Sequence, residues 1–211
     1  MEYIKKRASP ENEDFGKKYK QAGIIATMLI NNYFRCVGKL IECIPDEEVR
    51  SALEVGCGEG YSTKIIKKLL DDKIKFEASE YVKTMVPIAK TMNPTIKIIQ
   101  EDVYKLKREN NSFELIFLLE VLEHLDFPDM ALKEIKRVSS KYLILGVPRE
   151  PIWRILNMSR GKYLRSFGNT TGHLNHWSSK DLIRIIEHKF GRVINIEKPL
   201  PWTIILAKKI S

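Results

Sequence analysis

Residues 51–60 read Ser-Ala-Leu-Glu-Val-Gly-Cys-Gly-Glu-Gly, a short apolar segment that stops at three glycines on alternate positions. An apolar run of this length is typical of a buried β-strand. The next segment, residues 62–70, carries apolar residues at helical spacing. Because glycine tolerates positive φ and lets a ligand approach the main chain, the pattern predicts a sharp strand-to-helix turn at a binding site.

The alternation of strand and helix continues along the chain. Further strands are expected at residues 74–78, 96–99, 113–119, 142–147, 193–196 and 203–207. Helices are expected at residues 23–43, 82–92, 130–138, 151–158 and 178–189, with Ser178 as the N-cap of the last. This order predicts an α/β three-layer sandwich with a mostly parallel seven-stranded sheet, closed by an antiparallel C-terminal hairpin.

The chain of 211 residues is long enough for one sizeable core and is expected to form a single domain. Residues 1–45 are interpreted as an N-terminal helical cap. Residues 148–177, a loop-rich stretch after the fifth strand, are interpreted as a lid insertion. An insertion there lies at the carboxyl edge of the sheet, where open α/β sheets bind ligands.

The spacing of the glycines distinguishes between ligands. The dinucleotide fingerprint would need a glycine at position 61, which is Tyr61, and no Gly-Lys-Ser/Thr of a phosphate-binding loop follows. Glu54, two residues before Gly56, adds a carboxylate that would repel a pyrophosphate. A nicotinamide-dependent oxidoreductase is therefore disfavoured.

Four segments in order carry a resemblance to a known family. The acid-x-Gly-x-Gly-x-Gly turn resembles the first motif of class I S-adenosylmethionine-dependent methyltransferases. Glu80 follows at the tip of the second strand and Asp102 at the end of the third. The segment Leu-Glu-Val-Leu-Glu-His-Leu, residues 119–125, resembles the fourth element of the type 11 group. The resemblance spans roughly residues 50–190 and implies the Rossmann-like methyltransferase fold.

The resemblance implies S-adenosylmethionine as cofactor and S-adenosylhomocysteine as product. An acid at the tip of the second strand is placed to bind the ribose hydroxyls, a role given to Glu80. In the family the adenine amino group is bound by the residue matching Asp102, with the main chain of Val103 beside the ring; Glu101 is expected to face solvent. The full set of implied cofactor-binding residues is Glu54, Gly56, Cys57, Gly58, Gly60, Glu80, Tyr81, Asp102, Val103 and Glu120.

Two histidines, His124 and His173, are the candidates for a catalytic base. Glu120, Glu123 and His124 are spaced i, i+3, i+4, so a helical turn would place them on one face. With His173 they resemble the divalent-cation ligands of ubiquinone-biosynthesis and small-RNA 2′-O-methyltransferases. Many relatives keep these residues without a metal, so the metal is the less favoured alternative and no metal ligand is assigned.

The lid insertion is rich in aromatic and basic residues. Its short helix packs as a lid through Trp153 and Leu156 in the favoured interpretation, and touches a membrane surface in the other. An aromatic wall for the acceptor is expected from Trp153, Tyr163, Phe167 and Trp177, and charge for an anionic acceptor from Arg149, Arg154 and Arg165.

Composition bears on partners and compartment. The net charge is +9, and residues 131–165 hold nine Lys/Arg against two acids, which would suit a nucleic acid only if they form one surface. Three cysteines without a CxxC pair indicate a reducing cytoplasm. The apolar run at residues 22–30 is too short to span a bilayer, and the polar segment 5–14 is not a secretory signal.

The sequence thus predicts S-adenosylmethionine-dependent methyl transfer, with O-methylation of a small-molecule or lipid-like acceptor favoured. The alternatives are an RNA methyltransferase and a catalytically silent protein that binds S-adenosylmethionine. Nothing in the sequence determines the oligomeric state.

Overall fold

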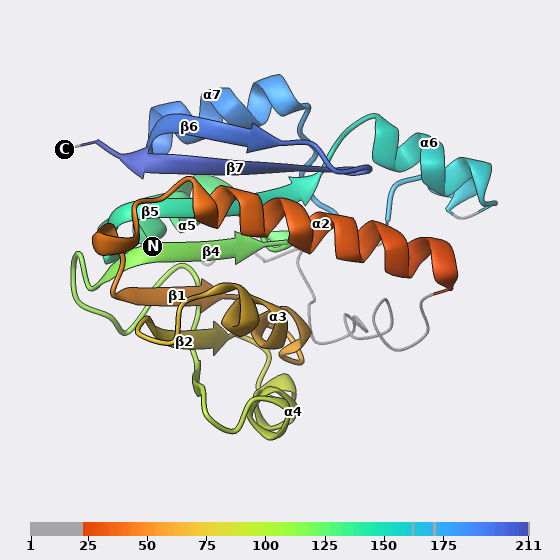
Figure 1. Ribbon diagram of the computed structural model, residues 1–211. Helices are drawn as coiled ribbons and strands as arrows, with labels where there is room; N and C mark the ends of the chain where they lie inside the picture. Colours follow the sequence, from red (N-terminus) through yellow and green to blue (C-terminus); the bar gives the residue numbers. More distant parts are fainter. Residues whose placement is uncertain (1–22, 162, 171, 211) are drawn as a thin grey trace, which may run out of the picture.

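The computed structural model describes residues 23–161, 163–170 and 172–210, which form a seven-stranded sheet with helices on both faces (Figure 1). The strands are β1 (Ser51–Val55), β2 (Lys75–Glu80), β3 (Lys97–Gln100), β4 (Phe113–Leu119), β5 (Ser139–Pro148), β6 (Gly191–Glu197) and β7 (Trp202–Lys209). The helices are α2 (Ile24–Glu42), α3 (Tyr61–Leu69), α4 (Met85–Met92), α5 (Pro128–Val138), α6 (Ile152–Ser159) and α7 (Ser179–Lys189). Three short 3-10 turns are η2 (Asp46–Glu48), η3 (Leu122–His124) and η4 (Leu164–Ser166).

The strand order is β3-β2-β1-β4-β5-β7-β6. Strands β1 to β5 pair in parallel, and β7 runs antiparallel to both β5 and β6. The predicted α/β sandwich with an antiparallel C-terminal hairpin is therefore confirmed. The order reverses between β1 and β4, and crevices at such reversals bind ligands in open parallel sheets.

The sheet is buried on both faces, which explains the continuous apolar run of β4. Leu115, Phe117 and Leu119 belong to the core shared with α2, α3 and α4. Ile116 and Leu118 belong to the core shared with α5 and α7. Alternate residues of β4 thus pack into the two separate cores on either face of the sheet. Because β1 to β5 are parallel, their carboxyl ends lie along one edge of the sheet.

Helix α2 is the described part of the predicted N-terminal cap; residues 1–22, including the segment 5–14, lie outside the described residues. The helix packs along one face of the sheet through Tyr33, Val37 and Leu40, and its first turns extend past the carboxyl ends of β4 and β5 (Figure 1). A Cβ at Gly146 of β5 would lie 2.2 Å from the Tyr33 hydroxyl, so glycine allows this close approach. Among the described residues, no helix has the length and apolarity needed to cross a bilayer.

Replacing Leu40 with alanine tests the packing of α2 on the sheet. The Leu40 side chain is fully buried, so Leu40→Ala leaves a cavity and should lower the free energy of unfolding by about 2–5 kcal/mol. Urea denaturation measures the change. The matched control is Ile88→Ala on α4, where the side chain is half-exposed, and it should lower the free energy of unfolding by less than about 1 kcal/mol. Equal losses in both variants would contradict the packing described for α2.

Candidate cofactor and acceptor site

The glycine turn joins β1 to α3 and has the predicted conformation. Gly56, Gly58 and Gly60 have φ of 79°, 56° and 89°. A Cβ at Gly56 would come 2.5 Å from Val121, and one at Gly60 would come 2.4 Å from the Asn93 amide, so both glycines are packed against protein. At Gly58, by contrast, no described atom lies within 4 Å of a Cβ position. The middle of the turn is the part that a ligand can approach.

Main-chain hydrogen bonds tie this turn to β2. The amides of Gly56 and Cys57 donate to the Ser79 carbonyl at 2.8 and 3.0 Å. The next amide, of Gly58, donates to a Glu80 carboxylate oxygen at 2.7 Å, and the other oxygen accepts from the Val82 amide at 2.7 Å. Glu80 thus lies at the tip of β2 against the turn, as the sequence predicted.

Two acids are buried at this turn. The Glu54 carboxylate accepts a hydrogen bond from the Thr63 hydroxyl at 2.5 Å and is 1% exposed. Burial, with a further contribution from the charge of Glu80, raises the pKa of Glu54 to about 7. Burial also raises the pKa of Glu80. Two partly desolvated carboxylates in electrostatic contact favour a cationic ligand, because a positive charge would relieve their mutual repulsion.

The loop after β3 places Asp102 and Val103 near the same edge. An Asp102 carboxylate oxygen accepts from the Tyr104 amide at 3.0 Å, and Val103 is buried. The expectation that Glu101 faces solvent is wrong: it is 4% exposed, and the Arg108 guanidinium binds it at 3.0 Å.

Arg108 is a residue that the sequence analysis missed. Its guanidinium also binds Glu77 of β2 at 2.6 Å, and the Lys107 amide donates to Glu101 at 3.1 Å. Glu77 also binds Lys75 at 3.2 Å and Lys97 at 3.3 Å. The chain after Asp102 therefore folds back and pairs Arg108 with two buried acids. No local pattern indicates this, because Glu77 and Arg108 are far apart in sequence and meet only through the sheet.

At the end of β4 the predicted helical turn is replaced by a different geometry. Glu120 has φ of 59°, and its amide donates to the Gly146 carbonyl at 2.9 Å; a 3-10 turn begins only at Leu122. The prediction that Glu120, Glu123 and His124 share a helical face is wrong, because the left-handed residue rotates Glu120 away from the turn. A left-handed non-glycine residue costs about 1–3 kcal/mol and is typical of functional sites.

Glu123, His124 and His173 come together at this turn. One potential ligand atom from each lies within 4.8 Å of the others, and Glu120 is not in the group. The His124 ring meets the His173 ring edge-on at 5.0 Å, and His124 Nδ1 lies 3.2 Å from the Gly172 carbonyl. The amides of residues 174 and 175 donate to the Glu123 carbonyl at 2.8 and 3.0 Å, which holds the His173 loop against β4.

The aromatic wall differs from the prediction. Trp153 stacks on His173 at 5.6 Å and contacts Trp202 at 5.9 Å, and Trp202 contacts Tyr33 of α2 at 5.1 Å. Two of the expected members, Tyr163 and Phe167, are 41% and 77% exposed, and Trp177 packs on the opposite core. Trp202 and Tyr33 were missed because they come from opposite ends of the chain.

The charged side chains in and before residues 148–177 form local pairs and lie at different ends of the sheet. A Glu150 oxygen lies 3.5 Å from Arg154 Nε and 3.4 Å from His176 Nδ1. Burial, and then the charge of Arg154, lowers the pKa of His176. Lys141 donates to the Glu48 carbonyl near the start of β5, whereas Arg154 follows the end of that strand, so residues 131–165 do not form one basic surface. Lys162 of this stretch lies outside the described residues.

The last two cofactor residues predicted beside this edge are Cys57 and Tyr81. Cys57 is buried within the turn, and the half-exposed Tyr81 follows Glu80, its carbonyl accepting from the Gln100 side chain at 3.1 Å. The structure therefore collects the predicted cofactor residues around the carboxyl ends of β1 to β4.

Part of the chain is similar in sequence to known proteins. Residues 53–142 match the family model described as a methyltransferase domain. A probable S-adenosylmethionine-dependent methyltransferase of Mycobacterium tuberculosis strain CDC 1551 is 29% identical over 101 residues, covering 47% of this chain and 36% of its own length. The chain thus spans about a third of that relative.

Solved structures share the fold. The magnesium protoporphyrin IX methyltransferase of Synechocystis, solved with bound SAH, aligns with a TM-score of 0.69 over 92% of both chains at 14% identity. A Haloferax volcanii putative methyltransferase, solved in complex with the Trm112 methyltransferase activator, aligns with a TM-score of 0.68 at 12% identity over 88% of this chain and 92% of its own.

The seven-stranded fold is therefore shared with solved methyltransferase structures, and the glycine turn begins within the segment that matches the methyltransferase-domain model. The family-model match over residues 53–142 and the shared fold are thus similarities to methyltransferases.

The raised pKa of Glu54 predicts how stability depends on pH. The folded protein holds a proton on Glu54 up to about pH 7, whereas the unfolded chain loses it near pH 4.5. Stability should therefore fall as pH rises from about 4.5 to about 7, by an amount on the order of 3 kcal/mol from this group. Urea denaturation at pH 5 and pH 8 should show a clearly smaller fall for Glu54→Gln, whose amide oxygen can still accept from Thr63. An identical fall in both proteins would show that Glu54 ionises normally.

Proposed function

We propose that this protein binds S-adenosylmethionine and transfers its methyl group to a hydroxyl oxygen of a small-molecule or lipid-like acceptor. The observation that carries the proposal is the position of the buried Glu80 carboxylate. It lies at the tip of β2 against the open glycine, Gly58, beside the point where the strand order reverses.

The residues at the turn suit this cofactor. S-adenosylmethionine has no phosphate and carries positive charge on its ammonium and sulfonium, which fits the buried acids Glu54 and Glu80. Glu80 would bind the ribose hydroxyls, Asp102 the adenine amino group, and Val103 would flank the ring. Gly56, Cys57, Gly58, Gly60, Tyr81 and Glu120 would complete the site. When bound, the cofactor supplies an activated methyl group on a sulfonium.

The acceptor would lie on the histidine side of the site. His173 is 8% exposed and is held by stacking on Trp153 and by the edge contact with His124. A hydroxyl nucleophile must lose a proton, and an imidazole placed within hydrogen-bond reach can take it, a contribution of about 10²- to 10⁴-fold. Holding two reactants in line can supply about 7–11 kcal/mol more.

Apolar surroundings favour a lipid-like acceptor. Trp153, Trp202 and Tyr33 form a continuous aromatic contact next to His173. In this proposal the chain is one domain, with α2 and residues 148–177 flanking the acceptor side. We also propose a cytoplasmic location, which the free thiols of Cys36, Cys43 and Cys57 support.

A divalent cation is the second candidate for activating the hydroxyl. Glu123, His124 and His173 have ligand atoms within 4.8 Å of one another, and imidazole with carboxylate is a plausible donor set. We favour the metal-free interpretation, in which His173 or His124 is the base. A nucleic-acid acceptor is less favoured, since the basic stretch is divided between the two edges of the sheet.

Replacing Glu80 tests the cofactor proposal. Glu80→Ala removes the acceptor of two ribose hydroxyls, and hydrogen bonds to a charged group contribute about 1.5–3 kcal/mol each, so affinity for S-adenosylmethionine should fall at least about tenfold. Titration calorimetry gives the affinity, with the exposed-acid variant Glu109→Ala as a control of unchanged affinity. Thermal unfolding of each variant checks the fold. Unchanged affinity in a folded Glu80→Ala protein would refute the ribose assignment.

Replacing the two histidines tests the base. An acceptor can be found by following transfer of a labelled methyl group to hydroxylated compounds and to total lipid extract. On that acceptor, His173→Ala or His124→Ala should lower kcat by about 10²- to 10⁴-fold with little change in affinity for S-adenosylmethionine. Activity should survive a chelator. Loss with the chelator and recovery with added divalent ions would favour the metal instead, and full activity of both variants would remove the histidines from the mechanism.

A further inference from the structure

Helix α6 packs on the protein through Trp153 and a buried asparagine. Asn157 is 3% exposed, and its amide donates to the Gly168 carbonyl at 2.9 Å and to the Thr170 hydroxyl at 3.1 Å. The Trp153 indole also donates to Thr170 at 2.8 Å. On the outward side, Ile155 is 54% exposed and Met158 is 37% exposed. Packing through Trp153 and Asn157 therefore leaves Ile155 and Met158 without burial against the protein.

The segment after α6 continues the apolar exterior. Tyr163, Leu164 and Phe167, which include and flank η4, are 41%, 60% and 77% exposed. Tyr163 and Phe167 both adopt positive φ, 55° and 50°, conformations that cost about 1–3 kcal/mol when the residue is not glycine. Gly168 anchors the segment, because a Cβ there would lie 2.3 Å from the Arg154 carbonyl. The aromatic side chains are thus held outward by the fold of the segment.

The charge of this region has one sign. Residues 151–180 contain five Lys/Arg and no Asp or Glu. Arg160 and Arg165 are exposed beside the apolar side chains, and Arg160 donates to the Asn157 side chain at 2.8 Å. We define the α6–η4 surface as this exposed set: Ile155, Met158, Arg160, Tyr163, Leu164, Arg165 and Phe167.

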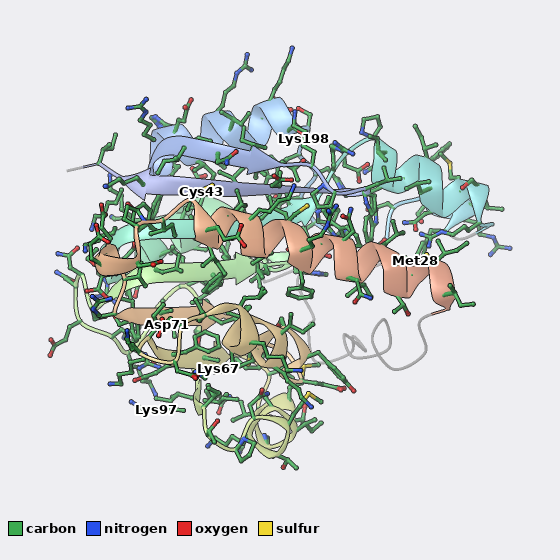
Figure 2. All side chains as sticks on the ribbon, viewed as in Figure 1. Met28, Cys43, Lys67, Asp71, Lys97 and Lys198 are labelled. Carbon is green, nitrogen blue, oxygen red and sulfur yellow. The ribbon has the colours of Figure 1, made fainter. Side chains whose placement is uncertain are left out.

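A second exposed apolar group projects from the same edge of the molecule. Ile24, Ile25 and Met28 in the first turns of α2 are 78%, 75% and 64% exposed. Figure 1 shows that these turns and α6 both extend past the carboxyl ends of β4 and β5, and Figure 2 shows Met28 near the projecting end of α2, far from Cys43. Groups of exposed large apolar residues are typical of interaction sites.

We propose that the α6–η4 surface binds an anionic lipid bilayer, with its apolar side chains in the interface and Arg160 and Arg165 on the headgroups. A bilayer fits both properties of the surface, because apolar burial and attraction of basic residues to anionic lipid act together. The inner side of the same helix carries Trp153, which stacks on His173. The surface therefore lies beside the acceptor site, and, resting on the proposed function, it indicates that the hydroxylated acceptor is a membrane lipid.

Vesicle co-sedimentation of the full chain tests this inference. Vesicles of phosphatidylcholine and phosphatidylglycerol in a two-to-one ratio should bind the protein, and phosphatidylcholine alone should bind it more weakly. The pair Arg160→Gln and Arg165→Gln should weaken binding to the anionic vesicles by about 10- to 30-fold, since each basic residue contributes about 1 kcal/mol. The pair Ile155→Ser and Phe167→Ser should weaken binding to both kinds of vesicle at least about tenfold.

Matched controls separate the surface from general charge and hydrophobicity. Ile88→Ser on α4 and Arg192→Gln on β6 replace exposed residues of the same types elsewhere and should leave vesicle binding unchanged. Calorimetry with S-adenosylmethionine shows whether the surface variants keep a folded site. Glu80→Ala should still bind vesicles, so failure of the cofactor assignment would be seen separately from failure of the membrane inference.

Two outcomes would overturn the inference. In the first, the native protein fails to bind anionic vesicles, or the surface variants bind them as well as the native protein does. In the second, size-exclusion chromatography shows a dimer that Ile155→Ser and Phe167→Ser dissociate, and the dimer does not bind vesicles. A second copy of the chain would then cover the surface.

Discussion

The connection between the glycine turn and β2 is the interaction on which the site depends. Two amides of the turn, from Gly56 and Cys57, share the Ser79 carbonyl, and the Gly58 amide binds Glu80. These bonds fix where β1 ends relative to β2 and leave the middle glycine open. A side chain at Gly56 or Gly60 would strike neighbouring protein in addition to requiring positive φ, so the turn is constrained by packing as well as by conformation.

The charge of the site differs from the charge of the whole chain. The protein carries +9, yet the turn holds two buried acids whose pKa values are raised by burial. Buried acids cost stability unless a partner compensates them, and a cationic ligand is such a partner. The other buried acids near this edge, Glu77 and Glu101, are both bound by Arg108, and Glu77 is bound by two lysines as well. The two pairs thus differ in their partners: Glu77 and Glu101 bind basic side chains, whereas Glu54 accepts from a hydroxyl and Glu80 from main-chain amides.

The acceptor side depends on contacts between segments that are remote in sequence. The His173 loop binds the Glu123 carbonyl, His173 stacks on Trp153, and Trp202 joins Trp153 to Tyr33 of α2. The inner side of α6 therefore contacts His173 through Trp153, while Ile155 and Met158 on its outer side are exposed. Asn157 is the most buried residue of the helix, and its hydrogen bonds to Gly168 and Thr170 satisfy its side-chain amide there.

The sequence by itself determined the order of strands and helices, the glycine turn and the acids at the strand tips, because these are local patterns or follow from the carboxyl ends of parallel strands meeting at one edge. The burial of Glu101, the geometry around Glu120 and the aromatic rings that meet beside His173 were decided by tertiary structure. Each depends on contacts between separate segments: Arg108 joins Glu101 to Glu77 of β2, Glu120 binds Gly146, and Trp153 meets Trp202. Local periodicity reports which side of an element is apolar, whereas only the folded sheet specifies which distant side chain that side meets.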